Sequence, residues 1–283
     1  MKIHFASAGF CTADQSHVYI NAPKGKTIFP AFWALIQHPT LGNILFDTGY
    51  SEHFLRATDA FPNRLYRMIV PVTFQKGDDV KTQLLENYNI DCQDISYIIV
   101  SHFHGDHVGG LKDFPQAKIV CTRKAFDHIW QHNHFWAFTK AYLKDLLPED
   151  LPARCIFIED NFSKIDNPYF ENVWEWEAAD LTFVELPGHA RGQVGVLLRS
   201  DGGSEQGDIF LVADAAWHIY SIENNVPPPS LVRVFADDYI ALKDSIARLH
   251  RFQKANFGTK IIISHCQTSL SQYVKNKNYP TTF

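Results

Sequence analysis

The sequence predicts an α/β protein in which two mixed β-sheets are sandwiched between helices. Short apolar runs that fit buried strands alternate along the chain with longer segments in which apolar residues follow helical spacing. Turn-forming residues near the start and the middle of the chain predict hairpins, which place antiparallel strands beside parallel ones. The two halves of the chain also follow the same order of strand, helix and strand.

In the first half of the chain, a short apolar strand ends at Asp47. Either Asp78 or Asp79 can cap the helix that follows, because apolar residues recur at helical spacing after them. Residues 95–100 then predict a buried strand, and this strand leads directly to His102.

The second half repeats this order. Residues 209–212 predict a strand that leads to Asp214, and a final strand leads to His265. Between them, Asp237 can cap a long helix that Gly258 ends. The apolar positions of this helix are Ile240, Ile246, Leu249 and Phe252.

We interpret the repeated order as an internal duplication. Chance similarity between two buried strands is the alternative, because short β-branched runs are common. Between the repeated parts, residues 201–204 predict a hairpin connection, and residues 224–230 contain three prolines and predict a loop.

The composition limits the classes of protein to which the chain can belong. Of its 283 residues, 46% are hydrophobic, which is enough for a substantial core, and we expect residues 1–283 to form a single domain. A net charge of -5 argues against binding to nucleic acid through phosphate contacts. Because no apolar run could cross a membrane and no secretory signal is evident, we expect a cytoplasmic protein. The five cysteines are scattered without a CxxC pair, which is typical of reduced thiols.

The most informative segment is a histidine cluster directly after the strand at residues 95–100. Its polar groups occupy six positions in the pattern His102-x-His104-x-Asp106-His107. On a helix His102 and His104 would point about 200° apart, whereas a loop after a strand can direct all these groups to one point. Glycines at positions 105, 109 and 110 provide the backbone freedom for such a loop. Imidazole and carboxylate donors suit zinc, iron and manganese, so the segment predicts a metal site.

Four ligands within six positions are hard to place around a single tetrahedral ion, so we expect two ions. His189, Asp214 and His265 would complete the ligand set. The segment around His189 is also ordinary loop chemistry, which leaves its role open. His128 and His132 are one helical turn apart and could pair on a metal, but without a third ligand an exposed helix face is the better interpretation.

These motifs, in their order along the chain, resemble those of the metallo-β-lactamase superfamily. The matching residues span most of the chain and are Asp47-Thr48-Gly49, His102-x-His104-x-Asp106-His107, Pro187-Gly188-His189, Asp214 and His265. The resemblance implies an αββα sandwich with two metal ions. It implies three sets of ligands: His102, His104 and His189 on one ion, Asp106, His107 and His265 on the other, and Asp214 as the bridge. It also implies that Asp47 orients a ligand imidazole, although an aspartate that forms a turn is an equal interpretation.

Within the superfamily, the chain is most similar to the N-acyl homoserine lactone lactonases. Both begin with a strand that is followed by Ala8-Gly9-x-Cys11. Those lactonases carry a tyrosine three positions after the bridging aspartate, where this chain has Trp217. An indole N–H can donate a hydrogen bond to a carbonyl group but cannot act as a titrating acid. Tyr220 could take the place of that tyrosine only if its loop turns toward the site.

The resemblance implies a hydrolase, in this branch a quorum-quenching lactonase, with two divalent ions. Zinc is the first expectation, and iron and manganese are alternatives. A hydroxide between the ions would attack the carbonyl group of a small lactone or ester, such as an N-acyl homoserine lactone. We expect Asp106, Asp214 and Trp217 to act in catalysis, with Asp214 transferring the proton. Phosphodiester or RNA cleavage and thioester hydrolysis are the alternatives within the superfamily, and the acidic charge balance argues against nucleic acid.

Aromatic residues make up 14% of the chain and cluster in groups such as Phe29, Phe32 and Trp33. They could line a channel for an acyl or aromatic substrate, although core or dimer packing is their more common role. Residues 123–147 predict one amphipathic helix that could cover the site. The sequence leaves a homodimer open.

Overall fold

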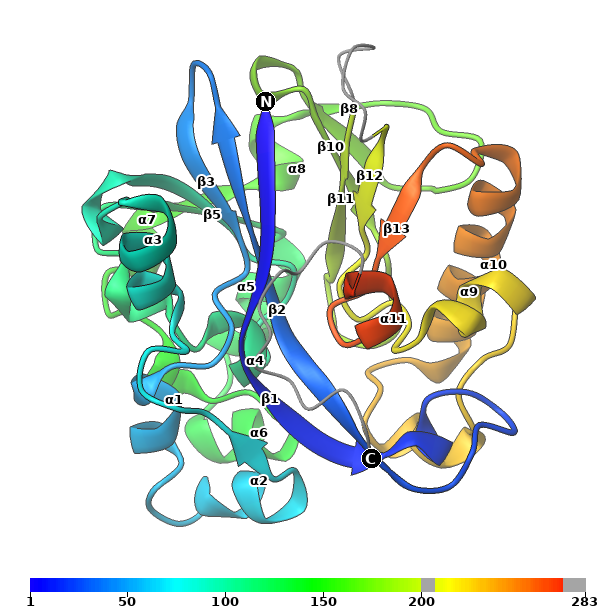
Figure 1. Cartoon of the computed structure of the whole chain (residues 1–283), viewed down its shortest axis with the longest axis horizontal. Helices are drawn as coiled ribbons and strands as arrows, with labels where there is room; N and C mark the ends of the chain where they lie inside the picture. Colours follow the sequence, from blue (N-terminus) through cyan, green and yellow to red (C-terminus); the bar gives the residue numbers. More distant parts are fainter. Residues whose placement is uncertain (200–206, 272–283) are drawn as a thin grey trace.

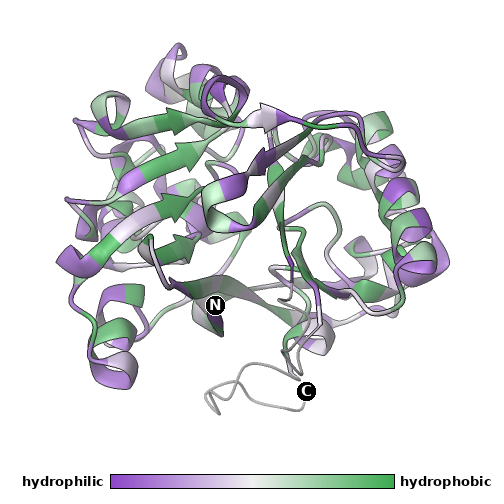
Figure 2. Cartoon of the chain, turned by 90° about the horizontal axis from the view of Figure 1, so that it is seen from above, coloured by the Kyte–Doolittle hydropathy of each residue, from purple (hydrophilic) through white to green (hydrophobic). Residues whose placement is uncertain are grey.

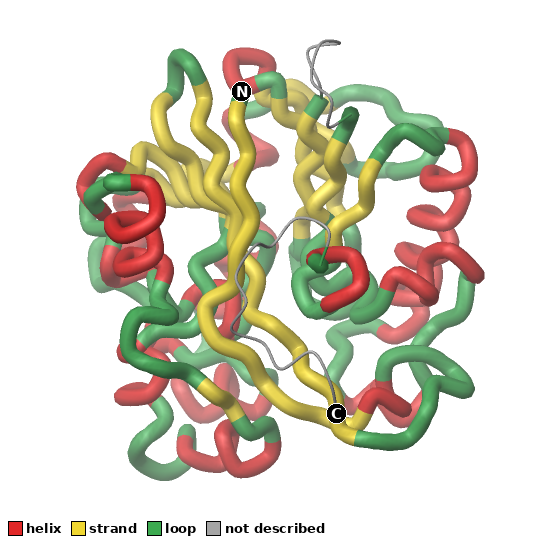
Figure 3. The backbone as a smooth tube through the Cα atoms, in the orientation of Figure 1, coloured by secondary structure: helices red, strands yellow, loops and turns green. Residues whose placement is uncertain are grey.

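Two β-sheets pack face to face between layers of helices in the computed structural model, which describes residues 1–199 and 207–271 (Figure 1). In the tube view the strands form the centre of the molecule and the helices lie on the outer sides (Figure 3). The predicted arrangement of two mixed sheets between helices is therefore confirmed.

The first sheet has seven strands in the order β4-β1-β2-β3-β5-β6-β7. Its β4, β1, β2 and β3 strands pair antiparallel, and β3, β5, β6 and β7 pair parallel. The strands are β1 Lys2–Asp14, β2 Lys26–His38, β3 Gly42–Phe46, β4 Val72–Thr73, β5 Ile95–Ile99, β6 Lys118–Cys121 and β7 Cys155–Phe157.

The second sheet has six strands in the order β13-β12-β11-β10-β9-β8. Neighbouring strands pair antiparallel except for β12 and β13, which are parallel. The strands are β8 Ser163–Lys164, β9 Val173–Trp176, β10 Leu181–Glu185, β11 Val194–Leu198, β12 Ile209–Leu211 and β13 Lys260–Ile262.

The helices are short, apart from α3, α5 and α10. The α-helices are α1 Glu52–Ala57, α2 Arg64–Ile69, α3 Val80–Tyr88, α4 Gly105–Val108, α5 Arg123–Trp130, α6 His134–Thr139, α7 Leu151–Arg154, α8 Ile158–Asn161, α9 Ile219–Asn224, α10 Tyr239–Ala255 and α11 Gln267–Leu270. The 3-10 turns are η1 Gln15–His17, η2 Cys92–Asp94, η3 Leu111–Asp113, η4 Lys144–Leu146, η5 Glu177–Ala179 and η6 Ser230–Val234. No described helix combines the length and apolar character that a bilayer span requires.

Three layers of apolar side chains hold the sandwich together. Successive residues of a strand point to opposite faces, so Phe32 enters the core between the sheets while Trp33 enters the core under the helices of the first sheet. The third core lies between the second sheet and helices α9 and α10, where the ring of Phe210 packs on Phe252 with centroids 5.3 Å apart. The strands are accordingly the most hydrophobic elements, and hydrophilic residues colour the outer helices (Figure 2).

The repeated order of elements has a counterpart in the sheets. In the first sheet β3 lies parallel to β5, and these strands lead to Asp47 and His102. In the second sheet β12 lies parallel to β13, and these strands lead to Asp214 and His265. The pairing agrees with the repeated plan, and the duplication behind it stays a prediction.

The single helix predicted over residues 123–147 is wrong. The segment forms α5, then α6, then the 3-10 turn η4. The Lys144 ammonium group donates hydrogen bonds to the carbonyl groups of Trp130 and His132, which satisfies acceptors at the break and ends the first helix. Ala141 has φ 62°, a left-handed conformation that ends the second helical segment.

Helix α10 differs from its prediction at both ends. Asp238 rather than Asp237 is the N-cap, and its Oδ1 accepts hydrogen bonds from the backbone N–H groups of Ile240 and Ala241 at 2.9 and 3.0 Å. The helix ends at Ala255, before Gly258. Ile240 is 75% exposed, because it lies about 120° around the helix from the buried Ile246.

One sequence prediction falls outside the described residues. The hairpin connection at residues 201–204 lies between the two described ranges. The strands on either side, β11 and β12, pair antiparallel, as a hairpin requires.

The packing of α10 gives a direct test of the outer core. We expect Leu249→Ala to lower the free energy of unfolding by about 2–5 kcal/mol, because it leaves a cavity at a fully buried position. Ile240→Ala on the same helix is the matched control and should change it by less than about 0.5 kcal/mol. Urea titrations of both variants measure these values, and equal losses would contradict the orientation of α10.

Candidate metal centre

The polar side chains singled out by the sequence meet where strands of both sheets end. His102 and His104 follow β5, and Asp106 and His107 lie in the one-turn helix α4. The other three follow strands of the second sheet: His189 after β10, Asp214 after β12 and His265 after β13. All seven side chains are buried, with at most 8% of any residue exposed.

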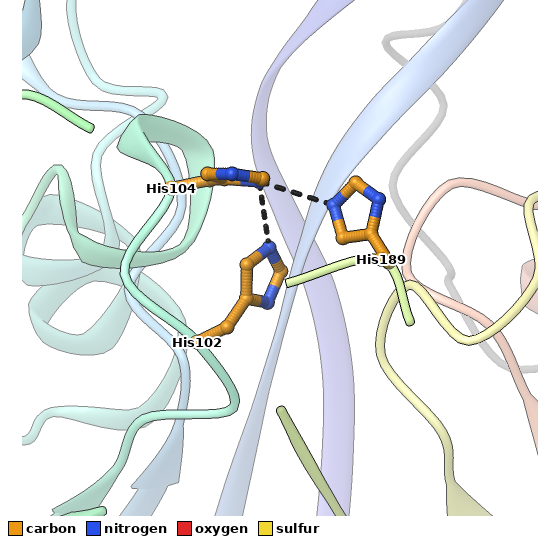
Figure 4. Close-up of side chains that lie close together, drawn as sticks. All are labelled: His102, His104 and His189. Carbon is orange, nitrogen blue, oxygen red and sulfur yellow. Dashed lines mark hydrogen bonds between the residues drawn. The ribbon is translucent and has the colours of Figure 1, made fainter. Parts of the chain in front are cut away.

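Three imidazole nitrogens form the first donor group, and all three residues are drawn in Figure 4. Nδ1 of His104 lies 3.0 Å from Nε2 of His102 and 3.0 Å from Nε2 of His189. For a tetrahedral zinc ion with bonds of about 2.0–2.1 Å, ligand atoms are about 3.3 Å apart. The three nitrogens therefore have nearly the spacing that one ion requires.

The second donor group contains Asp106, His107 and His265. Nε2 of His265 lies 3.2 Å from Oδ2 of Asp106, and Nε2 of His107 lies 3.7 Å from the same oxygen. This group lies beside the first, because His102 and His107 have ring centroids 4.0 Å apart.

Asp214 lies between the two groups. Its Oδ2 is 3.4 Å from Nε2 of His189 and 3.0 Å from Nε2 of His265, while its Oδ1 is 3.4 Å from Nε2 of His107. One carboxylate thus reaches a histidine of each group, as a bridging ligand must.

Unpartnered buried atoms test whether this donor set fits metal ions. Among the described residues, Nε2 of His107 and Oδ1 of Asp214 are buried and have no hydrogen-bond partner. Buried polar atoms are nearly always hydrogen-bonded, so these two atoms need a further partner. A cation between them would supply one, and the donor set fits divalent metal ions.

Supporting hydrogen bonds fix the orientation of two imidazoles. Nδ1 of His107 lies 2.8 Å from Oδ2 of Asp47, and Nδ1 of His265 lies 2.8 Å from the carbonyl oxygen of Pro30. Asp47 is itself held by the backbone N–H and the hydroxyl of Ser101. With Nδ1 donating outward, both rings direct Nε2 toward the centre.

The first group is electrically neutral. Burial lowers the pKa of His102 well below its usual value and lowers the pKa of His104 to about 3. Burial also lowers the pKa of His189. These imidazoles are therefore unprotonated at neutral pH, which is the form that binds a metal.

The second group carries charge. Burial opposes a charge on His107, but the carboxylates of Asp106, Asp214 and Asp47 together raise its pKa to about 10. The same kind of balance raises the pKa of His265, where Asp214 and Asp106 outweigh burial. Without metal, these imidazoles hold protons that compensate two buried carboxylates, and binding of divalent ions would displace them.

The three glycines of the histidine motif serve a different purpose from the one predicted. None of Gly105, Gly109 and Gly110 has a positive φ. A Cβ on Gly109 would lie 2.5 Å from the carbonyl oxygen of Gly49, and one on Gly110 would lie 2.9 Å from that of Thr48. Gly109 and Gly110 are therefore needed for close packing against the loop after β3, and a Cβ on Gly105 would lie 3.0 Å from the ring of Phe54. None of the three is needed for backbone freedom.

Gly188 positions His189. It has φ 129°, and a Cβ there would lie 2.1 Å from the backbone nitrogen of Leu242. The backbone N–H groups of Asp237 and Asp238 donate to the carbonyl groups of His189 and Gly188. Only glycine lets the start of α10 approach this loop so closely.

A cavity of about 410 Å³ opens onto the donor groups. Trp217 lies in its wall, with its ring edge-on to His189 at a centroid distance of 5.6 Å. Tyr220 is outside this wall: it is 41% exposed and packs on Tyr19 with centroids 4.6 Å apart. The loop therefore presents Trp217, and not Tyr220, to the site.

Other predicted candidates divide between wall and core. Phe29 lines the cavity, whereas Phe32 and Trp33 are core residues. His128 lines the cavity, but no metal-binding group among the described residues includes it or His132. Nδ1 of His132 instead lies 2.7 Å from the carbonyl oxygen of His128.

Three tyrosines of the cavity wall were not predicted as site residues. They are Tyr50, Tyr66 and Tyr142. The ring of Tyr142 lies 4.9 Å from that of His104, which no spacing in the sequence indicates.

The fold and the donor groups are those of a known class. A family model described as the metallo-beta-lactamase superfamily matches residues 27–203. The chain therefore belongs to the metallo-β-lactamase superfamily.

Within this superfamily, the chain is similar to several lactonases. The chain is 26% identical over 226 residues to an N-acyl homoserine lactonase of a Bacillus species, which covers 80% of each protein. The structure is also similar to that of an N-acyl homoserine lactone hydrolase, which was solved with the product N-hexanoyl-L-homoserine at its catalytic metal centre. The TM-score is 0.73 at 22% sequence identity, and the match covers 96% of this chain and 95% of that one. AidC, a dizinc quorum-quenching lactonase, has a TM-score of 0.58 at 16% identity, over 94% and 89%. The resemblance to the superfamily and to its lactonase branch is confirmed.

The hydrogen bond from His107 to Asp47 predicts a specific defect. We expect Asp47→Asn to weaken zinc binding by about 10–100-fold, because the amide lacks the negative charge that fixes the His107 ring. Competition with a chromophoric chelator measures the Kd. Asp113→Asn is the matched control, since it removes a carboxylate 3.2 Å from His53, outside the donor groups. An unchanged Kd for Asp47→Asn would contradict the supporting role of Asp47.

Proposed function

We propose that this protein is a dinuclear metal-dependent hydrolase that opens a small lactone or cleaves a small ester. The observation that carries the proposal is the pair of donor groups joined by Asp214. Two adjacent groups with one shared carboxylate suit two cations, and paired cations are typical of hydrolytic sites.

The ligands are assigned from these groups. His102, His104 and His189 hold one ion, Asp106, His107 and His265 hold the other, and Asp214 contacts both. Zinc is the metal proposed first, because nitrogen and carboxylate donors suit it and because the similar AidC is a dizinc enzyme. Divalent ions at these positions supply Lewis acidity, which polarises a carbonyl group and activates water.

The residues of the chain have three tasks in this reaction. The carboxylates of Asp106 and Asp214 lie where they can accept the proton of the attacking water and return it to the leaving oxygen. The indole N–H of Trp217 donates a hydrogen bond to a substrate carbonyl in the cavity. The buried surroundings exclude bulk water, which strengthens each of these interactions.

N-acyl homoserine lactones are the first substrates to test. Support comes from two relatives, the Bacillus lactonase and the solved hydrolase that holds N-hexanoyl-L-homoserine. The 410 Å³ of the cavity is within the usual range for small-molecule sites.

A substrate panel tests the proposal. Zinc-loaded protein should hydrolyse lactones or esters, and chelation should abolish the activity. Asp106→Ala and His107→Ala should lower kcat/KM by at least about 10²-fold, because loss of a ligand costs more than loss of a supporting partner. His38→Ala, at the end of β2 and outside the cavity wall, should leave the activity unchanged. Cleavage of bis-aryl phosphodiesters with inert lactones and esters would overturn the proposal in favour of a phosphodiesterase.

A further inference from the structure

The three tyrosines of the cavity wall differ in what their hydroxyl groups bind. The Tyr50 side chain is buried and its hydroxyl is hydrogen-bonded to Cys11. The Tyr142 hydroxyl is hydrogen-bonded to the backbone of Arg191. Within residues 1–199 and 207–271, the hydroxyl of Tyr66 has no hydrogen-bond partner. One donor of this wall is therefore uncommitted.

Packing holds Tyr66 in the wall. It lies in helix α2, and its ring meets Phe54 edge-on with centroids 5.5 Å apart. Phe54 is fully buried and packs in turn on Tyr50. The Tyr66 ring is thus held in place by Phe54, and its half-buried side chain borders the cavity.

Tyr66 lines the same cavity as Asp106 and Asp214 of the candidate metal centre. Burial raises the pKa of Tyr66 well above its usual value, and the negative charges of Asp106 and Asp214 raise it further. The hydroxyl therefore keeps its proton at neutral pH and can donate a hydrogen bond. Because the side chain borders the cavity, this hydrogen bond is available to a ligand that binds there.

We propose that Tyr66 is a catalytic residue whose hydroxyl donates a hydrogen bond to the leaving oxygen of the substrate. The role rests on the proposed lactone or ester hydrolysis. As water adds to the carbonyl carbon, one of its protons passes to the carboxylate of Asp106 or Asp214. The C–O bond then breaks, its electron pair moves to the leaving oxygen, and that oxygen takes this proton, while the other proton of the water stays on the new carboxyl group. Tyr66 stabilises the charge that develops on this oxygen and is not consumed.

Trp217 and Tyr66 do not duplicate each other. Trp217 lies against His189 of the first donor group, whereas Tyr66 reaches the cavity from helix α2 and packs on Phe54. The wall therefore offers two donors from separate segments of the chain. A substrate ester has two oxygens, so each donor can serve one of them.

The test compares Tyr66→Phe with Tyr220→Phe. Tyr66→Phe removes only the hydroxyl, and we expect kcat for an alkyl ester or lactone to fall about 10²-fold with KM within about two-fold. The loss should shrink for aryl esters, whose leaving oxygen needs less stabilisation. Tyr220→Phe, outside the cavity wall, should keep wild-type kinetics. Metal content and thermal midpoint should be unchanged in both variants.

A binding measurement gives a readout that does not depend on turnover. An alkyl phosphonate ester, whose charged oxygens imitate the transition state, should bind the zinc-loaded Tyr66→Phe variant about 10²-fold more weakly than wild type in calorimetry. Active wild-type protein with an unchanged kcat and phosphonate Kd in Tyr66→Phe would overturn the role of Tyr66 alone. Wild-type protein inactive on every lactone and ester would overturn the proposed function and this role together.

Discussion

Compensation of buried charge is the constraint on which the candidate site depends. Asp106 and Asp214 are buried among five imidazoles, of which those of the first donor group are neutral. Burying a carboxylate costs free energy of folding unless an opposite charge lies beside it. Two cations held by both donor groups satisfy the carboxylates and the free imidazole lone pairs together. Protons on His107 and His265 satisfy only the carboxylates.

The side chains that compensate this buried charge come from both sheets of the sandwich. Each sheet contributes a parallel strand pair that ends at an aspartate and a histidine. The sheets are also joined at the site, because His265 of the second sheet bonds Pro30 in β2 of the first. In the same way, the backbone N–H of Val194 in β11 donates to the carbonyl of Ser101 after β5. Small movements between the sheets would therefore change the donor geometry, which links the core packing to the chemistry.

The sequence alone predicted a feature correctly where residues of one chemical type also lie close together along the chain. The cluster from His102 to His107 is too dense to be an ordinary turn, and its position after a strand placed it correctly at the end of a sheet. The resemblance to the superfamily implied that Asp47 orients an imidazole, and Asp47 does lie beside the imidazole of His107. These features are local, or repeat a local pattern.

Features that depend on contacts between distant parts of the chain could not be predicted from the sequence. The break between α5 and α6 depends on Lys144, which returns from beyond the break to bind two carbonyl groups. The cap of α10 depends on competition between neighbouring aspartates, and Asp237 is held instead by Arg191 at 3.2 Å. Tyr66 and Tyr142 reach the cavity from separate segments, and nothing in their spacing joins them to the histidines.

The central claim is that seven side chains from both sheets hold two metal ions. Anomalous diffraction at the zinc edge, from crystals of zinc-loaded protein, tests it most directly. We predict two peaks, one among His102, His104 and His189 and one among Asp106, His107 and His265, with Asp214 between them. A map without a peak among these residues would contradict the account.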